Sequence, residues 1–233
     1  MKRAVELFTF EAVRSSSAYV SGAWRTSSDP DPEDAFMSGA VAQWEIVVTR
    51  QAESTSVTVR GPESRATAAP IPPDAEFFGI SFTLGTFMPA LDPRRLVDRS
   101  LTLPMASATT FWLHGSAWEL PGPANADLFV DRLVRDGLLV HDPVVPAALG
   151  DRPDAERAVQ ALSTRSVERR VARATGLTRG TIRQIRRADR AVEMLSRGLP
   201  APEVARRAGY TDQPHLTRSL RRFIGQTPTE IAC

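Results

Sequence analysis

The stretch from Leu162 to Ile231 carries one sequence pattern twice, with the two copies 49 positions apart. Aligned positions hold residues of the same kind: Val167 with Leu216, Arg169 with Arg218, Val171 with Leu220, Arg173 with Arg222, Gly176 with Gly225, and Thr178 with Thr227. Ser163 and Asp212 also align, and both residue types commonly cap the N-terminus of a helix. Because a fixed spacing marks a repeated structural unit, this stretch is predicted to form two similar helical units.

The second copy has the signals of two helices joined by a tight turn. The first helix is predicted over residues 202–208, and Gly209 ends it because glycine tolerates the left-handed conformation. Asp212 caps the next helix, which has an apolar stripe at helical spacing: Leu216, Leu220, Phe223 and Ile224. The opposite face carries Gln213, Thr217, Arg218 and Arg221. Such a face suits the major groove of DNA, and a merely solvated polar face is the alternative.

The first copy repeats this reading face. Ser163 is predicted to cap a helix that runs to Thr175, and the outward residues are Arg165, Glu168, Arg169 and Arg173. Glu168 has two interpretations: it accepts a hydrogen bond from a cytosine amine, or it orients Arg165 or Arg169 as a neighbour on the helix. Between the copies, residues 178–196 are predicted to form one long helix. Such a helix would hold the two recognition helices apart, and consecutive major grooves require about 34 Å.

Charge separates the two parts of the chain. Residues 1–150 contain 12 Lys and Arg against 18 Asp and Glu, a net charge of −6. Residues 151–233 contain 17 Arg against nine Asp and Glu, a net charge of +8. A basic domain favours nucleic acid as its partner, although a basic surface that only maintains solubility remains the alternative.

The first 110 residues are predicted to be mostly strands and loops. Short segments rich in Val, Ile, Phe, Thr and Trp indicate strands at 3–10, 18–24, 41–49, 56–60 and 77–84. Helices are predicted at 92–97, 111–120 and 127–139, and the proline-rich segment 141–153 is predicted to be the domain boundary. Five short strands favour a small sandwich or barrel.

The motifs of the last third resemble the AraC/XylS family of transcriptional regulators. The segment Gly209-Tyr-Thr-Asp-Gln-Pro-His-Leu-Thr-Arg-Ser-Leu-Arg-Arg-Phe-Ile-Gly-Gln-Thr-Pro228 is close to that family's C-terminal signature, and 162–178 resembles its first recognition unit. The resemblance implies an α+β chain with a seven-helix DNA-binding domain at 151–233. It also implies a β-rich, cupin-like sensing or dimerisation domain at 1–120, with 121–150 as a helical connector.

By position, the resemblance implies six base-reading candidates: Arg165, Glu168, Arg169, Gln213, Pro214 and Arg218. His215, Thr217, Arg221 and Arg222 are expected to meet phosphates, and Arg173 joins the DNA-binding set from the outward face of the first copy. Pro214 departs from the pattern because it offers only apolar contact. Residues 154–161 also depart, being short and mostly polar or small, so the first unit is predicted to have the weaker support and to contribute less to DNA affinity.

The remaining sequence excludes several classes. No nucleophile elbow or phosphate-binding loop occurs, so no catalytic site, cofactor or metal is expected. The lone Cys233 can form no internal disulfide, and no apolar run reaches the 18 residues of a membrane span. A cytoplasmic protein without a signal peptide is therefore predicted.

The first domain offers aromatic candidates for a ligand pocket: Trp24, Trp44, Phe78 and Phe82. The competing interpretation is that they fill a β core. Candidate partners are double-stranded DNA, a small-molecule effector, RNA polymerase and a second copy of the chain, with no membrane. The predicted function is sequence-specific transcription regulation. The alternatives are a cupin-like enzyme, which stoichiometric transition metal would reveal, and a protein-binding module whose basic tail lacks sequence preference.

Overall fold

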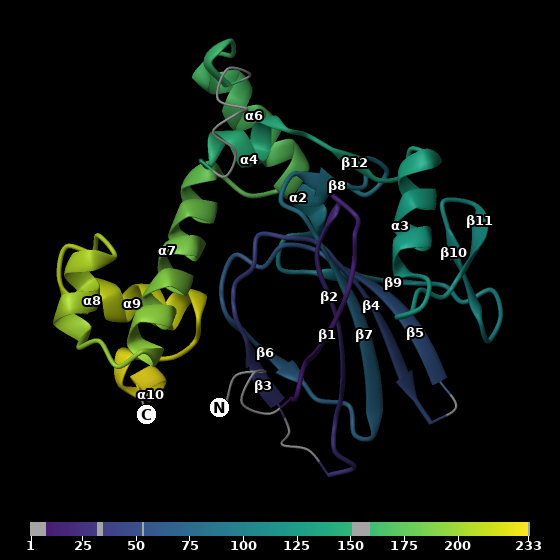
Figure 1. Ribbon diagram of the computed structural model, residues 1–233, viewed down its shortest axis with the longest axis horizontal. Coiled ribbons are helices and arrows are strands. Elements are labelled where there is room, and N and C mark those ends of the chain that lie inside the picture. Colours follow the sequence, from purple (N-terminus) through teal and green to yellow (C-terminus); the bar gives the residue numbers. More distant parts are fainter. Residues whose placement is uncertain (1–7, 32–34, 53, 151–158, 233) are drawn as a thin grey trace.

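The computed structural model describes residues 8–31, 35–52, 54–150 and 159–232. Its N-terminal part is rich in strands and its C-terminal part is helical, which confirms the predicted α+β class with two regions (Figure 1). The helix α7, Arg179–Ser196, runs from the top of the strand-rich part to a group of helices beside it.

A six-stranded antiparallel sheet with strand order β1-β2-β7-β4-β5-β9 forms the centre of the N-terminal part. Its strands are β1 Glu11–Val13, β2 Val20–Ser27, β4 Glu45–Gln51, β5 Ser54–Arg60, β7 Ala75–Phe82 and β9 Ser100–Leu103. Three short pairs complete it: β3 Ala35–Ser38 with β6 Thr67–Pro70, β8 Thr86–Phe87 with β12 Val140–His141, and β10 Thr110–Leu113 with β11 Ser116–Glu119. Four of the five predicted strands correspond to β2, β4, β5 and β7. The fifth, at 3–10, lies largely outside the described residues, and residues 8–10 are not strand.

The two faces of this sheet differ because side chains alternate along each strand. One face belongs to the hydrophobic core, with Ile46 and Val48 on β4 opposite Ile80 and Phe78 on β7. The other face carries Glu45, Val47 and Thr49 on β4 beside neighbours such as Trp24 and Arg60. This second face lines a cavity.

The segment predicted as a helix at 111–120 is a β-hairpin, so that prediction was wrong. His114 and Gly115 both have positive φ, +50° and +79°, and they form the two-residue turn between β10 and β11. Phe111 and Trp118 pair across the hairpin and are buried, whereas Trp112 is exposed. The aromatic residues happen to fall at helical spacing, which led to the wrong prediction. Gly115, between two short runs of strand-forming residues, was the better signal because it indicates a hairpin turn.

The predicted helices on either side of this hairpin are present as α2 Pro93–Leu96 and α3 Ala126–Arg135. The predicted boundary loop at 141–153 contains a further helix, α4 Val144–Ala148, four of whose residues are buried. Residues 151–153 of that loop lie outside the described residues. The helix α4 packs against α6, Thr164–Thr175, so part of the predicted loop supports the helical region.

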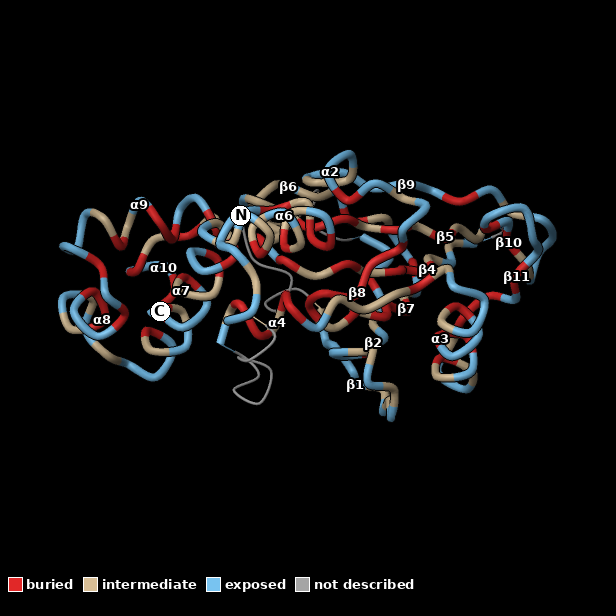
Figure 2. Tube along the Cα trace, turned by 90° about the horizontal axis from the view of Figure 1, so that it is seen from above, coloured by how far each residue is buried: buried red, intermediate tan, exposed pale blue. Residues whose placement is uncertain are grey.

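The C-terminal helices match the predicted order. They are α6 Thr164–Thr175, α7, α8 Ala201–Arg207, α9 Gln213–Phe223 and α10 Pro228–Ala232. The helix α6 packs against α2, α4 and β8, and thus rests on the N-terminal part, while α8, α9 and α10 surround the far end of α7 (Figure 1). The buried positions of α9 recur every three or four residues with exposed positions between them, as expected for a helix with one packed face (Figure 2).

Candidate nucleic-acid interface and interdomain cavity

The turn of the second unit is held by a polar cluster around Tyr210. Gly209 has φ +75°, the left-handed conformation that reverses the chain between α8 and α9. Tyr210 is buried, and its hydroxyl lies 3.1 Å from the Ser219 Oγ on α9. The Arg187 guanidinium lies 4.3 Å from the Tyr210 ring centre and donates to the Gly209 carbonyl. The long helix α7 therefore fixes the angle of the second unit.

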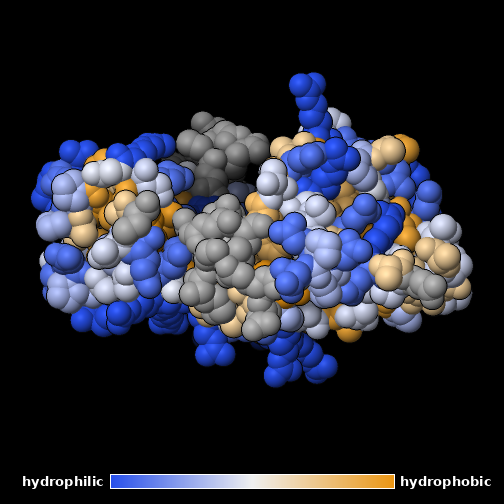
Figure 3. Space-filling view, turned by 90° about the horizontal axis from the view of Figure 1, so that it is seen from below, coloured by the Kyte–Doolittle hydropathy of each residue, from blue (hydrophilic) through white to orange (hydrophobic). Residues whose placement is uncertain are grey.

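The recognition helix α9 begins at Asp212, whose carboxylate accepts a hydrogen bond of 2.6 Å from the His215 backbone N–H. Its buried residues are Leu216, Ser219, Leu220 and Phe223. Its exposed residues are Gln213, Pro214, Arg218, Arg221 and Arg222. The predicted division into an apolar stripe and a polar face is confirmed, and the polar face points to solvent. Hydrophilic residues also predominate around the rim of this helical lobe, at the left of Figure 3.

Two candidate residues of α9 are partly engaged within the domain. The His215 ring is half-buried and meets the Tyr210 ring edge-on, with 5.2 Å between the ring centres. The Thr217 hydroxyl donates to the Gln213 carbonyl at 3.0 Å. Arg218, by contrast, is exposed midway along the helix.

The first unit presents a smaller free surface. Ser163 caps α6 by accepting from the Ser166 N–H at 3.2 Å, and Arg165 and Arg169 are exposed. Glu168 pairs with Arg179 of α7 at 2.9 Å, whereas one of its two predicted roles was to orient Arg165 or Arg169. Periodicity within one helix could not reveal this partner, because it lies beyond the turn after α6.

The first unit is also attached to the N-terminal part. The Arg173 guanidinium lies 5.9 Å from the Phe87 ring centre, and the Trp44 indole N–H donates to the Ala174 carbonyl at 3.3 Å. Asp142 accepts from the Val144 N–H at the start of α4 and pairs with Arg170 of α6 at 2.8 Å. Most of the predicted weak support at 154–161 lies outside the described residues. The sequence analysis placed residues 144–148 in the boundary between domains. In the structure they form α4, which packs against α6 and supports it.

A cavity of about 880 Å³ lies between the open face of the sheet and the helix α7. Strand residues form one wall, and Asp189, Val192 and Glu193 of α7, together with Ile224, form the other. Of the four aromatic ligand candidates, Trp24 lines this cavity. Trp44, Phe78 and Phe82 are buried in the core and are absent from its lining. Alternate residues of β4 were the missed signal: Glu45, Val47 and Thr49 share one face.

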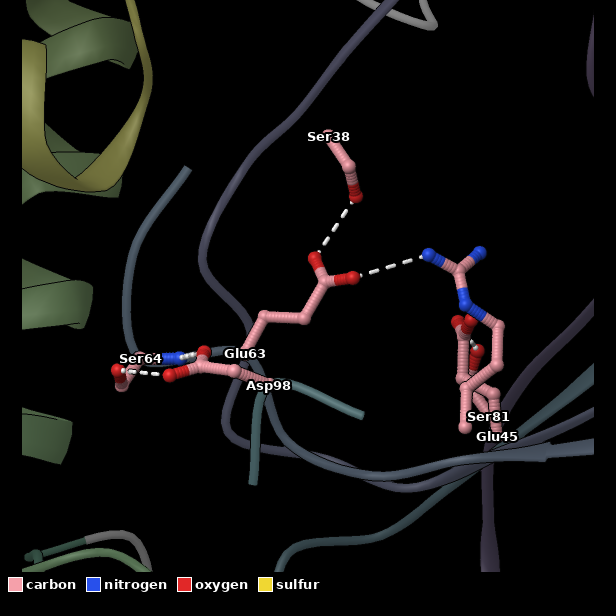
Figure 4. A network of polar contacts seen from close by, with 7 residues as sticks. Ser38, Glu45, Glu63, Ser64, Ser81 and Asp98 are labelled. Atoms are coloured by element: carbon pink, nitrogen blue, oxygen red, sulfur yellow. Dashed lines mark hydrogen bonds and ion pairs between the residues drawn. The ribbon is translucent and has the colours of Figure 1, made fainter. Parts of the chain in front are cut away.

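The polar groups of the cavity are arranged around Glu63. Its carboxylate accepts from the Ser38 hydroxyl at 2.7 Å and from the Arg60 guanidinium at 3.0 Å (Figure 4). Glu45 accepts from the Ser81 hydroxyl at 2.7 Å. On the α7 side, Asp189 lines the cavity while part of the residue stays in contact with solvent. Desolvation by the protein around it, together with the nearby Glu193, raises its pKa to about 6. The cavity thus combines an apolar wall with several carboxylates.

Other site classes find no support in the described ranges. Within residues 8–31, 35–52, 54–150 and 159–232, no group of three or more His, Cys, Asp or Glu side chains could hold a metal ion. In the same part of the chain, no helix combines the length and the apolar character needed to cross a membrane.

Comparison with known proteins supports the assignment of the last third. Residues 158–232 match a family model described as a helix-turn-helix domain. Among solved structures, that of ToxT from Vibrio cholerae covers 97% of this chain and 97% of its own, with a TM-score of 0.41 and 10% sequence identity. No curated protein matches the sequence. The family match spans both copies of the repeat, including α6 and α9.

Proposed function

We propose that the chain is a sequence-specific transcription regulator that responds to a small molecule, and the starting point is the match of residues 158–232 to a family model described as a helix-turn-helix domain. The observation that carries the proposal is the exposed face of α9. Gln213 and Arg218 project from a helix whose opposite face is fully packed. A rigid helix with free amide and guanidinium groups is what reading of base edges requires.

Base reading is assigned first to α9. Arg218 can donate two hydrogen bonds to the O6 and N7 atoms of guanine, and Gln213 can pair with the N6 and N7 edge of adenine. Pro214 would contact a thymine methyl group. Arg221 and Arg222 lie nearer the C-terminal end of the helix, where phosphate contacts position the protein without reading sequence.

The helix α6 is assigned a second, weaker contact. Arg165 and Arg169 are exposed and can reach bases or phosphates. Glu168 is paired with Arg179, so its use in DNA binding would break a contact within the protein. Arg173 is exposed, but its guanidinium lies 5.9 Å from the Phe87 ring centre and thus beside the N-terminal part. We therefore expect α9 to supply most of the discrimination between sequences.

Selection of bound sequences from random duplexes, with the full chain, tests this function. The expected result is an enriched motif whose strongest positions lie under α9, with weaker positions one helical turn, about 34–36 Å, away. Binding should weaken steeply with added salt, because phosphate contacts release counterions. A motif with two-fold symmetry would support a homodimer. Binding to DNA without any enrichment would contradict the proposal and favour a protein-binding module with a basic tail.

A further inference from the structure

The interdomain cavity has the size of a small-molecule site. Its volume of about 880 Å³ lies within the range of roughly 300–1,000 Å³ that is typical of ligand pockets. It is lined by the open face of the sheet and by α7, so an occupant would contact both the N-terminal part and the helix that joins the two recognition units. Any ligand class for this cavity must match the chemistry of its walls.

Aromatic rings dominate the apolar part of the wall. The Phe8 ring meets the Phe36 ring edge-on at 5.5 Å and the Phe77 ring at 6.2 Å, measured between ring centres. The Phe10 ring meets the Trp24 ring at 5.3 Å. All five residues line the cavity. Rings grouped in this way bury flat apolar ligands well, and their faces attract cations.

The charged groups of the wall are mostly carboxylates. Among the described residues, Glu45, Glu63, Asp189 and Glu193 line the cavity together with one cation, Arg60. Glu63 pairs with Arg60 at 3.0 Å and is only 15% exposed, so the charge of Arg60 is already compensated (Figure 4). Three carboxylates remain, and the described lining residues offer no second cation to balance them. An anionic ligand would meet repulsion here, whereas a cationic one would meet attraction.

The helix α7 places two carboxylates on the face that lines the cavity, where a bound cation could contact them. Asp189, Val192 and Glu193 are spaced at i, i+3 and i+4, which places them on one face of the helix. Within the described part of the chain, no ion pair of Asp189 or Glu193 is found, although the charges of Arg186 and Arg190 on the same helix act on Asp189. These two carboxylates are therefore available to an occupant.

The cavity is directly connected to the recognition helix α9. The Ala40 N–H donates to the Phe223 carbonyl at 2.7 Å, and the Ala66 N–H donates to the Arg222 carbonyl at 2.8 Å. Residues 37–40 line the cavity and Ile224 closes its other side. We call these two backbone hydrogen bonds the clasp. An occupant that displaces residues 37–40 must move the end of α9 that the clasp holds.

We propose that the cavity binds lipophilic organic cations, and that their binding repositions α9 through the clasp and so changes the affinity for DNA. The aromatic rings would bury the apolar body of the ligand, and Glu45, Asp189 and Glu193 would surround its charge. This inference rests on the proposed function only for its regulatory part, since ligand binding by itself can be measured without DNA.

Calorimetric titration of the full chain with two probes of equal size and opposite charge tests the ligand class. Tetraphenylphosphonium is expected to bind saturably, and tetraphenylborate at least about tenfold more weakly, a difference of about 1.4 kcal/mol. Asp189→Asn and Glu193→Gln should each weaken tetraphenylphosphonium binding without weakening that of tetraphenylborate. Glu76→Gln is the matched control, because Glu76 is exposed on β7 and does not line the cavity.

The two probes also separate a charge effect from a folding defect. A folding defect would weaken the binding of both probes, whereas loss of a carboxylate charge would weaken only that of tetraphenylphosphonium. Equal or tighter binding of tetraphenylborate would overturn the ligand class, as would full affinity for tetraphenylphosphonium in a variant that combines Asp189→Asn with Glu193→Gln. For the regulatory part, saturating tetraphenylphosphonium should change the affinity for the selected duplex at least about threefold. An unchanged DNA affinity would overturn the coupling, whereas failure to select any DNA motif would overturn the proposed function instead.

Discussion

The indole ring of Trp24 occupies the space that a Cβ atom at Gly79 would need. The two residues pair across β2 and β7, and the contact that a Cβ would make with the indole is shorter than any real one. Gly79 therefore allows the ring to lie against the sheet on the face that lines the cavity.

Gly79→Ala should displace the Trp24 ring and destabilise the protein by about 1–3 kcal/mol, as other overpacked sites do. It should also change the tryptophan fluorescence and weaken tetraphenylphosphonium binding. Urea unfolding and ligand titration measure both effects. Gly22→Ala on β2 is the control, because nothing lies within 4 Å of its Cβ position. Equal stability of the two variants would contradict this account.

Arg218→Ala should relax the base preference at one position of the selected motif and cost about 1–3 kcal/mol of specific binding. Fluorescence anisotropy at several salt concentrations, with the motif and with single-base variants, checks this. Arg135→Ala on α3 removes the same charge from an exposed site in the N-terminal part and should leave the preference intact. If both variants lose the same affinity for every duplex, Arg218 contributes only net charge.

Arg169→Ala on α6 should have a smaller effect on sequence preference than Arg218→Ala, because the reading face of the first unit is partly held by the protein itself. The expected signature is a uniform loss of affinity across duplexes with a salt slope reduced by about 1. A loss confined to one base position would instead assign direct base reading to α6.

Gly225→Ala should disturb the clasp. Gly225 has φ +82°, and a Cβ atom there would clash with the Met37 side chain. The left-handed backbone alone costs about 1 kcal/mol for alanine, and Gly198→Ala at φ +83°, with open space around it, is the matched control. The Gly225 variant should lose more stability in urea unfolding, by about 1–3 kcal/mol. It should also lose the effect of tetraphenylphosphonium on DNA affinity, which the Gly198 variant should retain.

The raised pKa of Asp189 predicts a pH dependence of stability. Its pKa is about 6 in the folded protein against 3.8 for an ordinary aspartate, so the folded state binds this proton more tightly than the unfolded state does. The resulting stabilisation is full below the ordinary pKa and is lost as the pH rises through about 6. Glu193, Arg186 and Arg190 surround Asp189 on α7, and Glu45, Arg60 and Glu63 share the cavity from the sheet.

The measurement is the free energy of unfolding in urea between pH 5 and pH 7, for the wild type and for Asp189→Asn. The difference between the two proteins should change with pH in favour of the variant as Asp189 ionises. Subtracting the variant removes every contribution that the two proteins share, so that only the effect of Asp189 remains. A difference that is constant over this range would show that the Asp189 pKa is not raised.

The helical domain could be predicted from sequence because its signals are local. The stripe from Leu216 to Phe223 follows from the 3.6-residue period of a helix. The cap at Asp212 and the turn at Gly209 follow from the chemistry of single residues, and the structure confirms all three. The hairpin at 110–119 was mispredicted because its aromatic residues suit a helical stripe as well as alternate strand positions. Only pairing with a neighbouring strand decides between the two.

By itself, the sequence determined the two helical units, the exposed arginines of their reading faces and the contrast in charge between the two parts of the chain. Only the tertiary structure decided that α4 supports α6, that Glu168 pairs with Arg179, and that Trp24 lines the cavity while Trp44, Phe78 and Phe82 fill the core. The physical reason is how far apart the interacting residues lie in the sequence. Helix faces follow from residues three or four positions apart. The clasp, by contrast, joins residues more than 150 positions apart, and the cavity brings Trp24 together with Ile224, so no local sequence period can predict that packing.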